Sequence, residues 1–211
     1  FMPAPGVTKS QVVFNASGHP GFRSEMLHAK GFTMVAPAFF NTIGGSDMRL
    51  LWIDDVDMNG PGHPSDYRFF LAGNWQNIWA TDTKMNGCRT GMKGVHFVRN
   101  VEIKDITDDA FHMNRVILNS TVDHMDQASF GSYHTDLYQF AGSGSVENFV
   151  IYGLTATNCR AQLIFADDLA TLDNVAFVNV VASRPSYETI GTGLASQWKD
   201  PSTNHLLLHH V

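Results

Sequence analysis

The feature that most constrains this chain is a short pattern that returns at intervals of about 25 residues, a period typical of solenoid repeats. Each copy is an asparagine followed by apolar residues at alternating positions. The copies begin at Asn77, Asn100, Asn148, Asn174 and Asn204, and a degenerate copy at 115–118 lies in the widest gap. Alternation with a period of two predicts strands, and its regular return predicts a solenoid with one coil per repeat. Helical repeats are excluded because they need about 33 residues or more.

A second landmark keeps nearly the same interval. Phe111, Leu137 and Leu163 follow one another at two equal steps, and the last two each precede a repeat asparagine by eleven. Two landmarks with one period predict stacked strands of a parallel sheet. We therefore expect an all-β chain that forms a right-handed single-stranded parallel β-helix of about six coils.

The composition favours turns and excludes several classes of function. Asp outnumbers Glu by 16 to 4, and there are only 6 lysines. Glu and Lys favour helices, whereas Asp, Asn and Gly favour turns. A net charge of -6 without a basic stripe argues against a nucleic acid as partner. No apolar run reaches the length of about 18 residues that a membrane span needs.

The chain divides into two parts. Residues 1–48 contain four prolines and no copy of the repeat. We expect this segment to be an irregular cap or flank, because an uncapped solenoid end exposes strand edges. The β-helix is expected over 49–211, with its first coil at 49–54. The last residues, 206–211, have the pattern of a strand that is truncated or covered by a partner.

The two cysteines are predicted to be free. Cys88 and Cys159 each lie eleven residues after a repeat asparagine, Asn77 and Asn148. Equivalent positions three coils apart are separated by about 14 Å. A disulfide requires Cα atoms within about 7 Å, so the two thiols cannot pair.

One strand motif resembles a known group of proteins. The stretch 134–139 reads His-Thr-Asp-Leu-Tyr-Gln, and further similar stretches are found at 108–111 and 148–154. From about residue 77 to 211 the chain resembles right-handed parallel β-helix proteins of the pectate-lyase-like superfamily. The motif is similar to that of bacterial secreted members with a His-x-Asp-x-x-Gln strand. The resemblance implies an extracellular or cell-surface protein that recognises a polysaccharide along one exposed sheet.

Stacking of these strands predicts a polar patch. If Phe111, Leu137 and Leu163 point into the core, the residues beside them point outward. The catalytic residues expected there are Asp108, His134, Asp136, Tyr138 and Arg160. The substrate-binding residues expected beside them are Arg89, His112, Gln139 and Gln162. The alternative interpretation is a solvated sheet face on which opposite charges alternate.

Two reactions fit such a patch. In an inverting glycoside hydrolase, Asp108 and Asp136 would serve as acid and base, at an expected separation of about 8 Å. In a polysaccharide lyase, Arg160 or a calcium ion held by the two aspartates would neutralise a uronate carboxylate. His134 or Tyr138 would then abstract the proton. Neither reaction requires another cofactor, and the histidine spacing indicates no metal site.

Two further functions stay open at this stage. One is a non-catalytic structural module, tailspike-like or filament-forming, that assembles end to end or as a homo-oligomer. The other is a carbohydrate-binding module that uses Trp75, Trp79 and Trp198 as stacking platforms. The repeat asparagines are interpreted as a ladder of amides that satisfies turn backbone. The Asp-rich stretch 54–60 is interpreted as an ordinary turn rather than a calcium loop.

Overall fold

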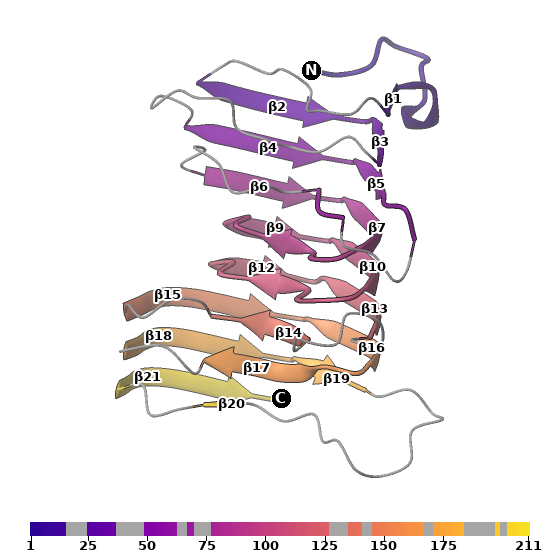
Figure 1. The fold of residues 1–211 in the computed structure, drawn as a ribbon. Helices are drawn as coiled ribbons and strands as arrows, with labels where there is room; N and C mark the ends of the chain where they lie inside the picture. The colour runs from indigo at the N-terminus through magenta and orange to yellow at the C-terminus, as the bar shows by residue number, and fades with distance from the viewer. Residues whose placement is uncertain are drawn as a thin grey trace.

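The computed structural model describes residues 1–15, 25–36, 49–62, 67–69, 77–126, 135–140, 145–166, 171–183, 197–198 and 202–211. In these residues the strands form three sheets, in which neighbouring strands run parallel. From residue 77 on the chain visits the three sheets in turn, coil after coil, whereas the described strands before it alternate between two of them (Figure 1). The protein is a parallel β-solenoid, as the repeat predicted. No helix in this part of the chain is long and apolar enough to span a membrane.

The three sheets are numbered in the order in which they occur along one coil. The first sheet contains β2 (Met26–Lys30), β4 (Leu50–Asp54), β6 (Asn77–Thr81), β9 (Phe97–Arg99), β12 (Val116–Leu118), β15 (Ser145–Tyr152), β18 (Thr171–Val178) and β21 (Ser202–His209). The second contains β1 (Val13–Phe14), β3 (Thr33–Val35), β5 (Asp57–Asn59), β7 (Lys84–Cys88), β10 (Glu102–Ile106), β13 (Thr121–Met125), β16 (Thr155–Cys159) and β19 (Val181–Ala182). The third contains β8 (Met92–Lys93), β11 (Phe111–His112), β14 (Asp136–Gln139), β17 (Gln162–Ala166) and β20 (Gln197–Trp198).

The solenoid begins before residue 49. Strands β2 and β3 pair in register with β4 and β5, so the stack starts one coil earlier than the sequence indicated. Part of the preceding chain packs on this first coil. The rings of Phe1 and Phe14 each meet Phe32 edge to face. Lys9, in the short 3₁₀ turn η1 (Lys9–Gln11), pairs with Asp55 and Asp57 at 3.0 and 2.8 Å.

The corner between the first and second sheets has the same form in each described coil. Two residues separate the strands, the first with positive φ and the second buried. The positive-φ residues are Gly31, Asp55, Asp82, Asn100, Asn119, Gly153 and Asn179. The buried residues that follow them are Phe32, Val56, Thr83, Val101, Ser120, Leu154 and Val180. Gly, Asn and Asp tolerate the left-handed region best, which explains why these types recur at the first position.

The repeat asparagines do not form one ladder. Asn100 lies in the corner turn, where its amide donates to Asp82 Oδ1 at 2.9 Å. Asn148 and Asn174 lie inside β15 and β18 as left-handed residues, and the amide of Asn174 donates to Asn148 at 3.3 Å. Asn77 begins β6. The predicted single ladder is wrong, because an asparagine suits more than one kind of left-handed position.

Coil length is also less uniform than the repeat suggested. In the first sheet Trp79 pairs with Phe97, and Phe97 pairs with Val116. These two coils are therefore shorter than the interval of the sequence repeat. The next step, from Val116 to its partner Val150, is nearly twice as long. Strand pairing therefore sets the stack, and the connections take up the differences in length.

The core lies between the three sheets. One of its columns contains Cys88, Ile106, Met125 and Cys159, which pair in register through four consecutive coils. Both cysteines are buried and free, as the sequence predicted. The prediction succeeded because the separation of the thiols depends on the number of coils between them and not on the length of each coil.

Candidate functional site

The candidate site lies at the second corner, where the chain leaves the second sheet for the third. Strands β7, β10, β13 and β16 end in register, so the residues that follow them also stack. These residues bring two arginines and several aspartates together over four coils. The charged side chains at the corner are Arg89, Asp108, Asp109, Asp126 and Arg160. We call this set the corner cluster.

Arg89 and Asp108 form the most enclosed ion pair described in the corner cluster. Arg89 Nε donates to Asp108 Oδ2 at 2.9 Å, and the two side chains are only 14% and 13% exposed. Thr90 Oγ1 contacts the same carboxylate oxygen at 3.4 Å. Backbone contact holds the pair, since the Asp108 N–H donates to the Arg89 carbonyl at 2.9 Å. The pair thus bridges two neighbouring coils.

The pKa of Asp108 is raised despite this partner. Burial is the largest cause, and the negative charge of Asp109 adds to it. The hydrogen bond and positive charge of Arg89 oppose the shift without reversing it. A carboxyl group with a raised pKa in a charged cluster is a recognised mark of a functional site.

Asp109 is held by a histidine on the next strand. His112 Nδ1 lies 3.4 Å from Asp109 Oδ2, and both side chains are largely buried. The other oxygen of this carboxylate, Oδ1, is buried and makes no hydrogen bond within the part of the chain that the structure describes. His112 in turn pairs in the third sheet with Lys93 and Gln139. Asp109 therefore keeps one unsatisfied acceptor oxygen that solvent does not reach.

The second ion pair of the cluster is more open. Arg160 Nη1 lies 3.7 Å from Asp126 Oδ1, with the arginine side chain 41% exposed and the aspartate 15%. A guanidinium presents its donors in a flat fork that suits carboxylates and hydroxyl groups. Because much of the Arg160 side chain lies in water, this fork can reach an anionic or hydroxylated group from solvent.

Two of the predicted catalytic residues do not face solvent. Tyr138 is only 1% exposed, packs against Phe140 and Phe177, and donates its hydroxyl to the Asn114 carbonyl at 2.6 Å. Asp136, two residues earlier on the same strand, is fully buried. The predicted outward orientation is therefore wrong for both.

The reason for this error is a register difference of one residue. Phe111 pairs with Tyr138 rather than with Leu137, so the step between β11 and β14 is one residue longer than the sequence predicts. A shift of one residue moves each side chain to the other face. The next step has the predicted length, and Asp136 pairs with Gln162 as expected.

The other predicted residues divide as follows. Arg89, Asp108 and Arg160 belong to the corner cluster. His112, Gln139 and Gln162 lie on the third sheet beside it, and His112 is buried instead of facing outward as predicted. His134 and Trp75 lie outside the described residues.

Sequence reasoning missed two members of the cluster, Asp109 and Asp126. Asp126 directly follows Met125, which stacks between Ile106 and Cys159, so the end of β13 could have located it. In the described parts of the chain no group of three or more His, Cys, Asp or Glu side chains could hold a metal ion.

Comparison of the chain with protein-family models, with curated proteins and with solved structures gives no match.

Proposed function

We propose that the protein recognises an extracellular polysaccharide at the corner cluster and hydrolyses it. The observation that carries the proposal is the enclosed carboxyl group of Asp108, which lies between Arg89 and Asp109 and has a raised pKa. A general acid must hold its proton near the working pH, and burial gives Asp108 this tendency. The resemblance to the pectate-lyase-like superfamily supports a sugar polymer as substrate and a secreted location.

Four charged groups of the cluster have a role in this proposal. Asp108 protonates the leaving glycosidic oxygen, and the negative charge of Asp109 helps it to keep its proton until then. Asp126, 15% exposed beside Arg160, activates the water. Arg160, which is more exposed than Arg89, binds sugar hydroxyls or a uronate carboxylate. This arrangement replaces the pair of Asp108 and Asp136, because Asp136 is buried.

The test is a panel of acidic and neutral polysaccharides, incubated with and without calcium. We expect new reducing ends without the ultraviolet absorbance of unsaturated sugars, and no requirement for calcium. Asp108→Asn should abolish the release of reducing ends. Asp105→Asn is the matched control, because Asp105 also contacts a neighbouring coil, through His124 on the second sheet. An absorbance increase would show β-elimination instead, and the absence of both signals would contradict an enzymatic function.

A structural module remains the second candidate, favoured by apolar side chains on β21. Leu207 and Leu208 are 52% and 55% exposed. Large exposed apolar side chains on a strand invite association with another chain. Sedimentation velocity of the protein and of Leu208→Asp tests this function. Assemblies that the substitution dissolves would support it, and a monomer in both cases would exclude it.

A further inference from the structure

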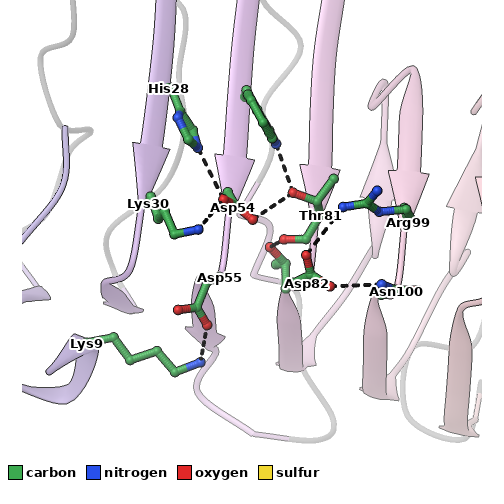
Figure 2. A network of polar contacts seen from close by, with 11 residues as sticks. Lys9, His28, Lys30, Asp54, Asp55, Thr81, Asp82, Arg99 and Asn100 are labelled. Carbon is green, nitrogen blue, oxygen red and sulfur yellow. Dashed lines mark hydrogen bonds and ion pairs between the residues drawn. The ribbon is translucent and has the colours of Figure 1, made fainter.

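The outer face of the first sheet carries a row of aromatic side chains. The corner cluster, in contrast, follows the strands of the second sheet. His28, Trp52, Trp79 and Phe97 occupy the same position on β2, β4, β6 and β9. Successive rings contact one another through the whole row. Two residues further along each strand, on the same face, the row is accompanied by polar side chains (Figure 2). The two rows together form one surface, which we call the aromatic face.

Trp52 serves as the support of this surface. Its ring stacks on His28 with centroids 4.1 Å apart and planes 12° apart. Its indole N–H donates to Thr81 Oγ1 at 2.8 Å, and Thr81 donates to Asp54 at 2.9 Å. The ring is thus held on one face and at its polar end. Trp52 is therefore fixed in place and is not available as a platform for a ligand.

Trp79 is the open platform. Its side chain is among the exposed large apolar groups, at 39%. Trp52 and Phe97 meet it at interplanar angles of 64° and 55°, with centroids 6.3 and 5.7 Å away. Neither neighbour stacks parallel on it. The indole is consequently fixed from both sides along the row while much of its surface stays in water.

A hydrogen-bonded polar group lies at the end of the strands that carry Trp79 and Phe97. Asp82 accepts from the Asn100 amide at 2.9 Å, and Arg99 Nη2 lies 3.6 Å from its other oxygen. Arg99 and Asp82 are about half exposed, at 47% and 46% of the side chain. Figure 2 shows how these three side chains place donor and acceptor groups side by side over two coils.

The charges of this face compensate one another. Lys30 pairs with Asp54 at 2.8 Å, and Arg99 pairs with Asp82. An ionic ligand therefore meets no net charge on this face that would attract it. A neutral ligand leaves the pairs intact and uses their remaining donors and acceptors. The aromatic face is therefore complementary to a molecule that is neutral, hydroxylated and apolar on one side.

We propose that the aromatic face binds a neutral hexopyranose polysaccharide, with one sugar ring stacked on Trp79. A pyranose presents a face of C–H groups to an indole and carries hydroxyl groups at its rim for Asp82, Asn100 and Arg99. Stacked strands lie about 4.8 Å apart, so the chain of sugars runs across the coils along the solenoid. The site is separate from the corner cluster, and its binding does not depend on catalysis there.

The experiment measures binding of soluble β-glucan, galactomannan and polygalacturonate by calorimetry and by retardation in polysaccharide-containing native gels. The wild-type protein should bind one of the neutral polymers. Trp79→Ala should weaken that binding about tenfold or more, by comparison with aromatic stacking on nucleobases. Trp79→Phe should retain part of the affinity, because a flat ring remains. Val181→Ala is the matched control, since Val181 is 58% exposed but lies on the second sheet, outside the aromatic face.

The outcomes separate this site from the corner cluster. Asp108→Asn should leave binding of the neutral polymer unchanged, and Trp79→Ala should leave the hydrolysis of short oligosaccharides unchanged. Equal affinity of Trp79→Ala and wild type would overturn the proposal. So would the failure of the wild-type protein to bind any neutral polymer, or binding of polygalacturonate alone. If Trp79→Ala unfolds, Trp79→Phe decides: it should bind the neutral polymer more weakly than Val181→Ala, and equal affinity of these two variants would overturn the proposal.

Discussion

At the scale of single residues, Asp54 shows how a charged group can be buried in a solenoid wall. Its side chain is 9% exposed and accepts from Lys30 at 2.8 Å and from Thr81 at 2.9 Å, with His28 at 3.3 Å. Burial favours the protonated acid, but the hydrogen bonds from Lys30, Thr81 and His28 outweigh it. The pKa of Asp54 is therefore lowered. The carboxylate links three coils.

This geometry predicts a pH-dependent contribution to stability. A carboxyl whose folded pKa lies below its unfolded value stabilises the fold above the unfolded pKa of 3.8 and loses this contribution as the pH falls through the folded value. Asp54→Asn should lower the free energy of unfolding at pH 7 by about 1–3 kcal/mol, the cost of removing a charged hydrogen-bond partner. Urea unfolding between pH 7 and pH 2.5 measures the difference, which should shrink in acid.

Asp82→Asn is the control for this prediction. Asp82 is half exposed, and its pair with Arg99 is long at 3.6 Å. Exposed ion pairs contribute about 0–1 kcal/mol, so this substitution should change stability little at either pH. An equal loss in both variants would show that burial and the three partners of Asp54 do not set its contribution.

At the scale of elements, the repeat pattern in the sequence corresponds in part to the left-handed residue of the first corner. The pair Asn100-Val101 is one copy of the turn, and the pairs Asp55-Val56 and Asn179-Val180 are others. A search for Gly, Asn or Asp followed by a buried apolar residue would have found more turns than a search for Asn alone. Sequence periodicity thus predicted the architecture but not the position of each turn.

The register of the third sheet could not be predicted from the sequence. Its strands are short, β11 being Phe111–His112 alone, and the connection before β14 includes two other strands, β12 and β13. Two periods that differ by one residue fit such strands equally well. The consequence is the wrong predicted orientation of Asp136 and Tyr138. The predicted positions of Asp108 and Arg89 are less sensitive to an error in strand register, because these residues belong to a corner and not to the alternating face of a strand.

Asn119 allows a clean test of the left-handed turn. Its φ is 48° and its side chain is exposed. Asn119→Val should lower the free energy of unfolding by about 1–2 kcal/mol, because a β-branched residue is strained in this region. Asn119→Gly should stay close to wild type. Chemical denaturation of the three proteins measures the effect, and equal losses for Val and Gly would point to the amide group instead of the backbone.

The reactivity of the two cysteines provides a test of how the strands of the second sheet stack. Burial raises the pKa of the Cys159 thiol to about 12 and raises that of Cys88 as well. The thiolate is the reactive form, so both thiols should resist a thiol reagent in the native, unreduced protein at pH 8. Unfolding should release two reactive thiols. No reactive thiol after unfolding would mean a disulfide, which this register does not permit.

At the scale of the whole molecule, aromatic rings from two sheets hold the later coils together. Phe177 of the first sheet meets Tyr138 and Phe140 across the core, with centroids 6.0 and 6.4 Å away. Phe140 also meets Phe149 on β15. In a solenoid each coil contacts mainly its neighbours, so such contacts between sheets set the cohesion of the stack.

Removing one of these rings should be costly. Phe177→Ala should lower the free energy of unfolding by about 3–5 kcal/mol, because it leaves a cavity in the core. Val150→Ala, on the outer face of the neighbouring strand, should cost about 0.5 kcal/mol or less. Urea unfolding followed by circular dichroism measures both. Similar effects of the two substitutions would argue against tight packing of Phe177 between the sheets.

The constant length of the first corner has a consequence for how this molecule could change. Every described turn at that corner has the same two-residue form, whereas the connections from the second to the third sheet vary widely, the one after β16 being far shorter than the one after β19. Added residues at the first corner would displace a buried side chain and the pairing of the next strand. The second corner already accommodates connections of different lengths. New loops, natural or grafted, are therefore tolerated where they can reshape the surroundings of Asp108 and Arg160, and the specificity of that corner can diversify while the scaffold stays the same.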